Sequence, residues 1–299
     1  MIPHDNKRAR LLPSATLDGL DNDLLIQCAS YLDADGLAQL GRTSARFGIP
    51  QAGQQRSLVN ETAHKRFQQS ATDEERSCLP KYVDESDVGL YRALALLRQP
   101  LCFDELVGGA FGPQEHPASV TFTGRGSWST AMSGHVMRGG RHFVEFAITK
   151  YEHDRQYIYL GAIRPVSLTN DMDLEDDWGG VVQPSNCSSR YKSALAKKLR
   201  SQCTGTWGEN YAHCCAYEYF DGQCSWTNWY DDSDWGSSFE MSEGSGTIGL
   251  LLDLDEGILS VFKNGRRLGV VKKGLGGEYC WFITACSACV RMSKGRAPE

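Results

Sequence analysis

The segment from Ile248 to Val271 restricts the possible folds more than any other part of this chain. It holds three short apolar runs, at residues 248–254, 258–263 and 266–271, separated by tight connections. The second connection is Asn264-Gly265, a pair that favours a type I′ hairpin turn because both central residues need a positive φ. The segment therefore predicts a three-stranded antiparallel meander. The residues that we assign to structural roles in its turns are Asp253, Asp255, Gly257, Asn264 and Gly265.

Further short strands are predicted upstream of this meander. Alternating or apolar runs indicate strands at residues 142–148, 156–163 and 217–220. Asp221-Gly222 is a hairpin signal, and Ser225 and Trp226 lie on the returning strand. One helix-like insertion, residues 191–200, interrupts this half. Several short strands with regular turn signals are typical of a sandwich or barrel rather than of a parallel sheet.

The chain before about Gly108 has a helical periodicity instead. The first apolar stripe consists of Leu20, Leu24, Cys28, Tyr31 and Leu32. Asp21 and Asp23 can cap this helix, and Asp33 or Asp35 can cap the next. Further helices are predicted around residues 37–44, 58–67 and 90–97. We therefore expect an α+β multidomain chain, with a small N-terminal helical domain followed by an all-β bent antiparallel sandwich.

The composition argues against some classes of function. The formal net charge is −6, whereas a nucleic-acid partner requires a clustered cationic surface. The apolar runs are much shorter than the roughly 18 residues of a membrane span, and no apolar segment follows the charged N-terminus. The 11 cysteines have irregular spacings that do not suggest a disulfide framework. We expect no nucleic acid, no membrane, and a location in the cytoplasm, the nucleus or both.

No catalytic, cofactor or metal site is expected. The Cys286-x-x-Cys289 pair lacks the second pair that a structural zinc site needs. The acidic run 171–177 lacks the glycine at position six and the glutamate at position twelve of a calcium loop. Residues 244–249 match G-x-G-x-x-G, but a strand follows them instead of the helix that a dinucleotide site requires.

The meander resembles the hallmark of the SPRY domain, which is an apolar strand, an Asp-bearing turn and a strand ending in Lys-Asn-Gly. Residues 249–257, 259–265 and 268–269 carry this resemblance. Residues 140–146 and 159–163 resemble early strands of the family, and residues 278–282 and 287–292 resemble its closing strands. The resemblance covers roughly Trp128 to Ser293. It implies a bent antiparallel sandwich that binds short segments of partner proteins with loops at one edge.

The helical half resembles an F-box. Residues 20–26 and 31–33, followed by Leu37, Leu40 and Phe47, keep the order of apolar positions in that motif. The motif usually has a proline after its first leucine, where this chain has Asp21. The resemblance implies docking onto a Skp-type adaptor of a cullin ubiquitin ligase. The residues expected in adaptor docking, where they are exposed, are Leu20, Leu24, Leu25, Ile26, Tyr31, Leu32, Leu37 and Leu40.

Together the two resemblances imply a non-enzymatic substrate receptor. We expect an F-box-like domain at residues 14–70, a helical connector at 71–120 and a SPRY-like sandwich at 121–294. Target-binding loops are expected at residues 151–156, 169–178 and 224–235, because polar loops on a rigid scaffold commonly carry binding residues. The candidate target-binding residues are Tyr151, Asp154, Arg155, Asp173, Trp178, Trp229, Tyr230 and Trp235.

Two alternatives stay open at this point. One is a scaffold protein without a ubiquitin link, in which the helical half only caps the β domain. The other is a carbohydrate-binding or glycosidase-like sandwich, because aromatic side chains near acidic residues also suit sugars. The residues behind this second alternative are Trp229, Tyr230, Asp231, Asp232, Asp234 and Trp235. The sequence does not name the target.

Overall fold

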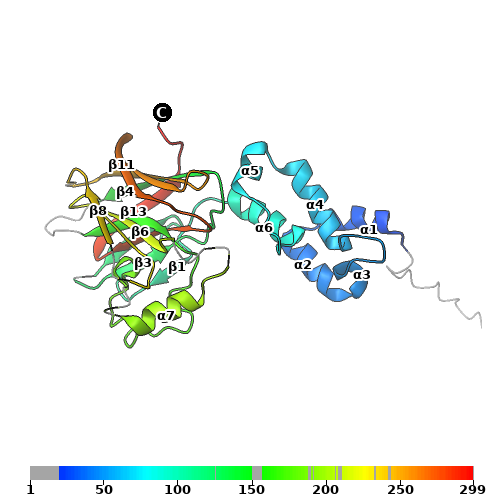
Figure 1. Ribbon diagram of the computed structural model, residues 1–299, viewed down its shortest axis with the longest axis horizontal. Helices are drawn as coiled ribbons and strands as arrows, with labels where there is room; N and C mark the ends of the chain where they lie inside the picture. Colours follow the sequence, from blue (N-terminus) through cyan, green and yellow to red (C-terminus); the bar gives the residue numbers. More distant parts are fainter. Residues whose placement is uncertain are drawn as a thin grey trace, which may run out of the picture. The chain divides into compact units, whose positions relative to one another are not determined.

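The computed structural model describes residues 20–124, 126–149, 157–187, 190, 192–205, 207, 211–231, 234–241 and 244–298. The chain folds into two compact units (Figure 1). Of the described residues, 20–71 and 81–95 form the helical unit, and those within 72–80 and 96–298 form the sandwich unit. The connector predicted at residues 71–120 is therefore divided between the two units.

The helical unit is built from short, capped helices. They are α1 (Asn22–Ala29), α2 (Ala34–Thr43), α3 (Ala45–Gly48), α4 (Leu58–Ser70) and most of α6 (Asp87–Arg98). The Asp21 carboxylate accepts a hydrogen bond from Leu24 N at 2.8 Å, and Asp33 accepts one from Gly36 N at 2.7 Å. Both aspartates thus cap helices as the sequence predicts. The core of this unit contains Leu25, Ala29, Leu37, Phe47, Leu58, Val59, Ala63 and Val88.

The sandwich unit consists of two antiparallel sheets. One has the order β1-β3-β12-β5-β6-β7-β8 and the other the order β11-β10-β9-β4-β13-β2. The expected α+β chain with an antiparallel sandwich is confirmed. The strands are β1 (Glu105–Val107), β2 (Ser119–Thr123), β3 (Ser129–Met132), β4 (Arg141–Thr149), β5 (Ile158–Ile163), β6 (Cys214–Glu218), β7 (Gln223–Thr227), β8 (Asp234–Ser238), β9 (Gly246–Asp253), β10 (Ile258–Lys263), β11 (Arg266–Lys273), β12 (Cys280–Ala285) and β13 (Ser287–Lys294).

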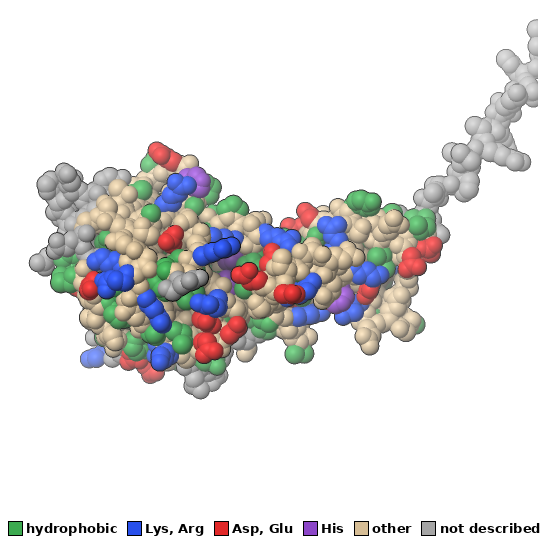
Figure 2. Space-filling view, turned by 90° about the horizontal axis from the view of Figure 1, so that it is seen from above, with side chains coloured by type: hydrophobic (Ala, Val, Ile, Leu, Met, Phe, Trp, Pro, Cys, Tyr) green, Lys and Arg blue, Asp and Glu red, His purple; other side chains and the backbone are tan. Residues whose placement is uncertain are grey.

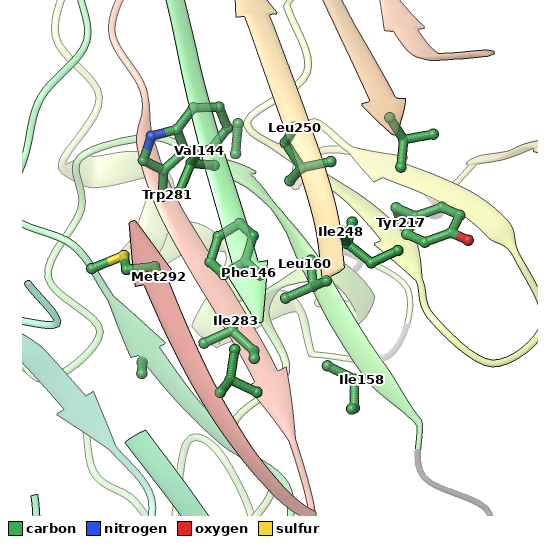
Figure 3. Close-up of a cluster of buried hydrophobic side chains, with 14 of the residues drawn as sticks. Val144, Phe146, Ile158, Leu160, Tyr217, Ile248, Leu250, Trp281, Ile283 and Met292 are labelled. Carbon is green, nitrogen blue, oxygen red and sulfur yellow. The ribbon is translucent and has the colours of Figure 1, made fainter. Parts of the chain in front are cut away.

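The main core lies between the two sheets. Alternate residues of each strand point into it, because successive side chains of a strand face opposite sides. Val144 and Phe146 of β4 meet Trp281 and Ile283 of β12 in this layer, as Figure 3 shows, and all four are buried. Burial of such large apolar side chains is the main stabilising contribution to a sandwich of this kind.

A second apolar cluster covers the outer face of the seven-stranded sheet. The helix α7 (Ser193–Ser201) packs Leu195, Ala196 and Leu199 onto this face (Figure 1). The short 3₁₀ turn at Pro184–Asn186 and the buried indoles of Trp178, Trp207 and Trp229 belong to the same side of the sheet. In this layer Trp229 donates a hydrogen bond to Pro184 O and Trp178 donates one to Leu168 O, so both indoles anchor their loops to the sheet.

The meander has the predicted turns. Asn264 and Gly265 have φ values of 51° and 79°, as a type I′ turn requires. The Asn264 side chain also accepts a hydrogen bond from Thr247 N at 3.0 Å, which ties the turn to β9. Asp253 accepts one from Glu256 N at 3.0 Å, and Asp255 accepts one from Gly140 N at 2.9 Å. These side chains therefore have the structural roles that the sequence predicts.

Several short elements were not predicted. The strands β1, β2 and β3 have three to five residues, and the helix α5 (Asp73–Cys78) has six. The prediction of a strand at residues 217–220 was displaced, since β6 occupies Cys214–Glu218 and the chain then turns. Most of that strand consists of small residues, namely Cys214, Cys215 and Ala216. Only its aromatic end therefore had the sequence pattern that indicates a strand.

The described surface is mixed in charge. On the face in Figure 2, lysine and arginine side chains are interspersed with aspartates and glutamates rather than gathered by sign. Of the helices that the structure describes, none has the length and apolar character that a membrane span requires.

Candidate functional site

In the loop between β7 and β8, the chain changes direction at Asn228 and Trp229. The Asn228 side-chain oxygen accepts hydrogen bonds from Tyr230 N at 2.9 Å and from Asp231 N at 3.1 Å. Trp229 has a φ of 59°, an unusual conformation for a bulky residue. Its indole is fully buried and donates to Pro184 O at 3.1 Å. Because Trp229 points inward from this turn, Tyr230 is left on the surface.

The exposed Tyr230 ring is held by α7. It is 46% exposed, and the guanidinium carbon of Arg200 lies 4.4 Å from its centroid, within the range of a cation–π contact. Arg200 also donates a hydrogen bond to Trp229 O. The His213 ring lies 6.2 Å from Tyr230. Burial, Arg164 and Arg200 together lower the pKa of His213 to about 4, so this imidazole is neutral at pH 7.

A cavity of 270 Å³ lies beside this loop, between β7 and β8 of one sheet and β11 of the other. Trp226 forms one wall, half-buried against the main core, and donates to Asp234 Oδ2 at 3.1 Å. The Lys272 ammonium lies 4.0 Å from the Trp226 ring centroid. The lining residues are Ala212, Trp226, Asn228, Asp231, Asp234, Lys272, Lys273 and Gly274.

The lining of this cavity has two carboxylates and two ammonium groups. Among the residues that the structure describes, Asp231, Asp234, Lys272 and Lys273 form no ion pair. Both charge types are thus available to a bound group. A polar side chain, or a chain segment with both a cation and an anion, fits this lining.

Trp235 is a second exposed aromatic residue, on the strand that also contributes to the cavity lining. It lies on β8, opposite Ser225 of β7, and is 54% exposed. Its neighbour Asp234 lines the cavity, so the strand alternation directs Trp235 to the other face of β8. Tyrosine and tryptophan side chains are typical of the residues that contribute most to protein–protein binding.

The target-binding candidates therefore have different surroundings. Tyr230 and Trp235 are exposed on the β7–β8 loop and on β8. Asp173 is exposed in another loop, where its carboxylate accepts hydrogen bonds from Glu175 N and Asp176 N at 2.8 Å. Tyr151, Asp154 and Arg155 lie outside the described residues.

Two of the target-binding candidates, Trp178 and Trp229, are buried, so their side chains are not available on the surface. Trp178 is 1% exposed and donates to Leu168 O at 3.1 Å, and Trp229 is fully buried. Both occur in polar, acid-rich segments, which suggested surface positions. A single large apolar side chain that turns inward can anchor such a loop to the sheet.

Arg164 supports this end of the sandwich, and sequence reasoning missed it. Its side chain is fully buried and donates to the carbonyls of Gly276, Glu278 and Trp207 at 2.7–2.9 Å. The Tyr279 ring lies 4.1 Å from its guanidinium carbon. Arg164 therefore joins loops that are distant in sequence, and only this long-range convergence identifies its role.

A second candidate surface lies on α1. Leu25 and Ala29 are buried, while the stripe on another side of the helix faces solvent. Leu24 is 46% exposed and Tyr31, just beyond the helix, is 84% exposed. The exposed members of this α1 stripe are Leu20, Leu24, Cys28, Tyr31 and Leu32.

The remaining adaptor-docking candidates are divided between core and surface. Leu25 and Leu37 belong to the core of the helical unit, and Ile26 and Leu40 are half-buried against it. Ile26 also lines a cavity of 370 Å³ in this unit, together with Asn22 and Gln51. The helical unit thus presents an apolar stripe and a hollow on α1.

Comparisons with known proteins identify no family for this chain. No family model matches it, and no curated protein matches it. Among solved structures, the SPRY domain of human HERC1 is 12% identical, with a TM-score of 0.43, and the match covers 66% of this chain and 98% of that chain.

Two further solved structures give similar values. A human SPRY domain is 13% identical, with a TM-score of 0.38, and the match covers 64% of this chain and 97% of that one. The TRIM65 PSpry domain is 12% identical, with a TM-score of 0.39 and coverage of 67% and 97%. Matches at these identities and TM-scores do not assign a family.

Proposed function

We propose that this chain is a protein-interaction protein whose sandwich unit binds a segment of a target protein beside β8. One observation carries the proposal: Tyr230 and Trp235 are exposed on the β7–β8 loop and on β8, and the same loop and strand also line a polar cavity walled by Trp226. The inward anchor of Trp229 and the contact from Arg200 hold Tyr230 in place before binding. Such preorganisation reduces the entropy that binding costs. The resemblance of the meander to the SPRY hallmark supports the same function.

The chemistry of the cavity suggests the kind of target segment. Two carboxylates and two ammonium groups line the cavity, so a segment with a cationic and an anionic residue side by side fits best. The indole of Trp226 provides an apolar wall for the stem of a long side chain.

We further propose that the α1 stripe docks a Skp-type adaptor of a cullin ubiquitin ligase. The support is the exposed apolar stripe itself together with the F-box resemblance of residues 20–47. An apolar stripe on a helix is suited to a groove on a partner protein. The chain would then act as a substrate receptor in the cytoplasm or the nucleus, with its chemistry performed by other subunits.

Site-specific photo-crosslinking tests the target-binding site. A benzophenone amino acid would replace Tyr230 or Trp235, one at a time, and a third protein would carry it at Glu115, which is exposed between β1 and β2. We expect positions 230 and 235 to crosslink to the same target segments and position 115 not to do so. Equal crosslinking patterns at all three positions would show that this site binds no target.

Binding of purified Skp-type adaptor tests the α1 stripe. We expect Leu24→Asp to weaken binding at least tenfold, because the charge falls in the centre of the apolar stripe. Gln39→Asp is the matched control, since it adds the same charge at an exposed position on α2. Calorimetry that detects no binding by the wild-type protein removes the ubiquitin link and leaves the scaffold alternative.

A further inference from the structure

A row of polar side chains crosses the outer face of the seven-stranded sheet. Thr130 of β3, Thr284 of β12, Tyr159 of β5 and Glu218 of β6 are cross-strand partners in one register. The Thr130 and Thr284 hydroxyls lie 2.6 Å apart, and Thr130 donates to Val182 O at 2.7 Å. The two threonines are thus satisfied, and the row ends at a carboxylate.

Unlike the threonine hydroxyls, the Glu218 carboxylate does not have a hydrogen-bond partner for each of its oxygens. The side chain is 3% exposed, one oxygen accepts a hydrogen bond from the Tyr159 hydroxyl, and Oε1 has no hydrogen-bond partner. The described residues provide no ion pair for it. A buried carboxylate oxygen without a donor is costly, so its retention calls for a reason such as a bound group.

Aromatic rings connect this carboxylate to the surface. The ring of Tyr159 lies 5.4 Å from that of Trp128, and the Trp128 ring lies 6.2 Å from that of Tyr157. Tyr157 is 36% exposed and Trp128 is half-buried, so the aromatic group reaches solvent. The faces of aromatic rings attract cations, and the attraction is stronger where water is excluded.

We propose that Glu218, with Trp128, Tyr157 and Tyr159, forms a site for the cationic head group of a lysine or arginine side chain on a partner protein. A guanidinium or an ammonium group would donate to Glu218 Oε1 and lie against the rings. The site is separate from the cavity beside Trp226, because that cavity lies where β6 begins and Glu218 lies where β6 ends.

Protonation of Glu218 gives this site a distinctive signature. Burial, and then the nearby Asp221 carboxylate, raise the pKa of Glu218 to about 7, although the Tyr159 hydroxyl opposes this shift. Tyr159 from β5 and Asp221 from the turn after β6 are the titratable groups that face it. A cation binds the ionised form, so binding near pH 7 releases a proton and weakens as the pH falls.

Small cationic probes test the site on the full-length protein. N-acetyl-argininamide and N-acetyl-lysinamide are the two cationic probes, and N-acetyl-citrullinamide is the uncharged isostere of the first. We expect calorimetry to detect binding of a cationic probe that is about tenfold weaker at pH 6 than at pH 8, as a pKa near 7 requires. A preference between arginine and lysine identifies the partner residue, and either one supports the site.

Matched variants test whether Glu218 is responsible for probe binding and for its pH dependence. Glu218→Gln should abolish binding and its pH dependence, whereas Glu115→Gln, the same change at an exposed position, should alter neither. Tyr157→Leu should weaken binding several-fold in a protein that keeps its thermal stability. A joint Tyr230→Ala and Trp235→Ala variant should still bind the probes. Equal binding of the arginine and citrulline probes, or unchanged binding by Glu218→Gln, overturns the proposal.

Discussion

The side chains of Trp229 and Tyr230 have opposite surroundings although the residues are neighbours. Trp229 adopts a positive φ because its indole fills a buried space against Pro184 and because Asn228 holds the turn. A conformation of this kind costs of the order of 1–3 kcal/mol, which the surrounding contacts must offset. The strain is therefore part of what presents Tyr230 on the surface.

The turn at Gly265 permits a direct test of backbone geometry. Gly265 has a φ of 79° and open space around it, so a valine there would be strained by its backbone alone. We expect Gly265→Val to lower the free energy of unfolding by about 1–2 kcal/mol. Gly109→Val is the control, because Gly109 also has open space but does not have a left-handed φ. Thermal unfolding with equal losses for both variants contradicts the turn assignment.

Glu218 makes the stability of the sandwich depend on pH. Its pKa is raised from 4.5 to about 7, so its contribution to stability is complete below pH 4.5 and is lost as the pH rises through 7. Glu218→Gln lacks this titration. We therefore expect the variant to match the wild type near pH 4.5 and to be more stable at pH 8.5, by up to about 3 kcal/mol. Denaturation curves with the same difference at both pH values contradict the raised pKa.

At the residue scale, the sequence predicted the roles that depend on a residue's own backbone preference. It did not predict the roles that depend on contacts with residues distant in the sequence. Asn264 and Gly265 determine a turn through their own φ preferences, so the identities of these two residues were enough to predict it. The burial of Trp229 depends on Pro184, and that of Arg164 on the carbonyls of Gly276 and Trp207, which no local pattern brings together. Glu218 gave no signal either, because its environment comes from neighbouring strands.

At the element scale, α1 has an apolar stripe in addition to its core-facing side. Leu25 is 3% exposed and Leu24 is 46% exposed, although the two residues are adjacent. We expect Leu25→Ala to destabilise the helical unit by about 2–5 kcal/mol and Leu24→Ala to change its stability by less than about 0.5 kcal/mol. Chemical denaturation of both variants measures the loss in the free energy of unfolding. Equal losses would mean that the helix is oriented differently.

Strong periodicity separates the elements that could be predicted from those that could not. The strands β4, β9 and β10 have six to nine residues with apolar residues on one or both faces, and each was predicted within two residues of its ends. The three-residue β1 has too few side chains for a period to be visible. Such short edge strands are specified by pairing with β3 rather than by their own sequence.

At the scale of the whole molecule, the sandwich unit begins earlier than the predicted boundary at residue 121. Leu101, Phe103 and Val120 are buried in its main core, and β1 and the first residues of β2 also precede the boundary. We expect a fragment of residues 96–299 to unfold cooperatively and a fragment of residues 121–299 to melt at least roughly 10 °C lower. Equal melting temperatures would show that residues 96–120 do not stabilise the sandwich.

Quantitative mass spectrometry of pull-downs can separate the two proposed protein-binding surfaces, the α1 stripe and the site beside β8. Full-length wild type would be compared with Leu24→Asp and with a joint Tyr230→Ala and Trp235→Ala variant. We predict that Leu24→Asp loses a Skp-type adaptor and its cullin but keeps the other partners, and that the joint variant keeps the adaptor but loses target proteins. The same partners at the same levels for all three proteins would show that neither surface binds a partner.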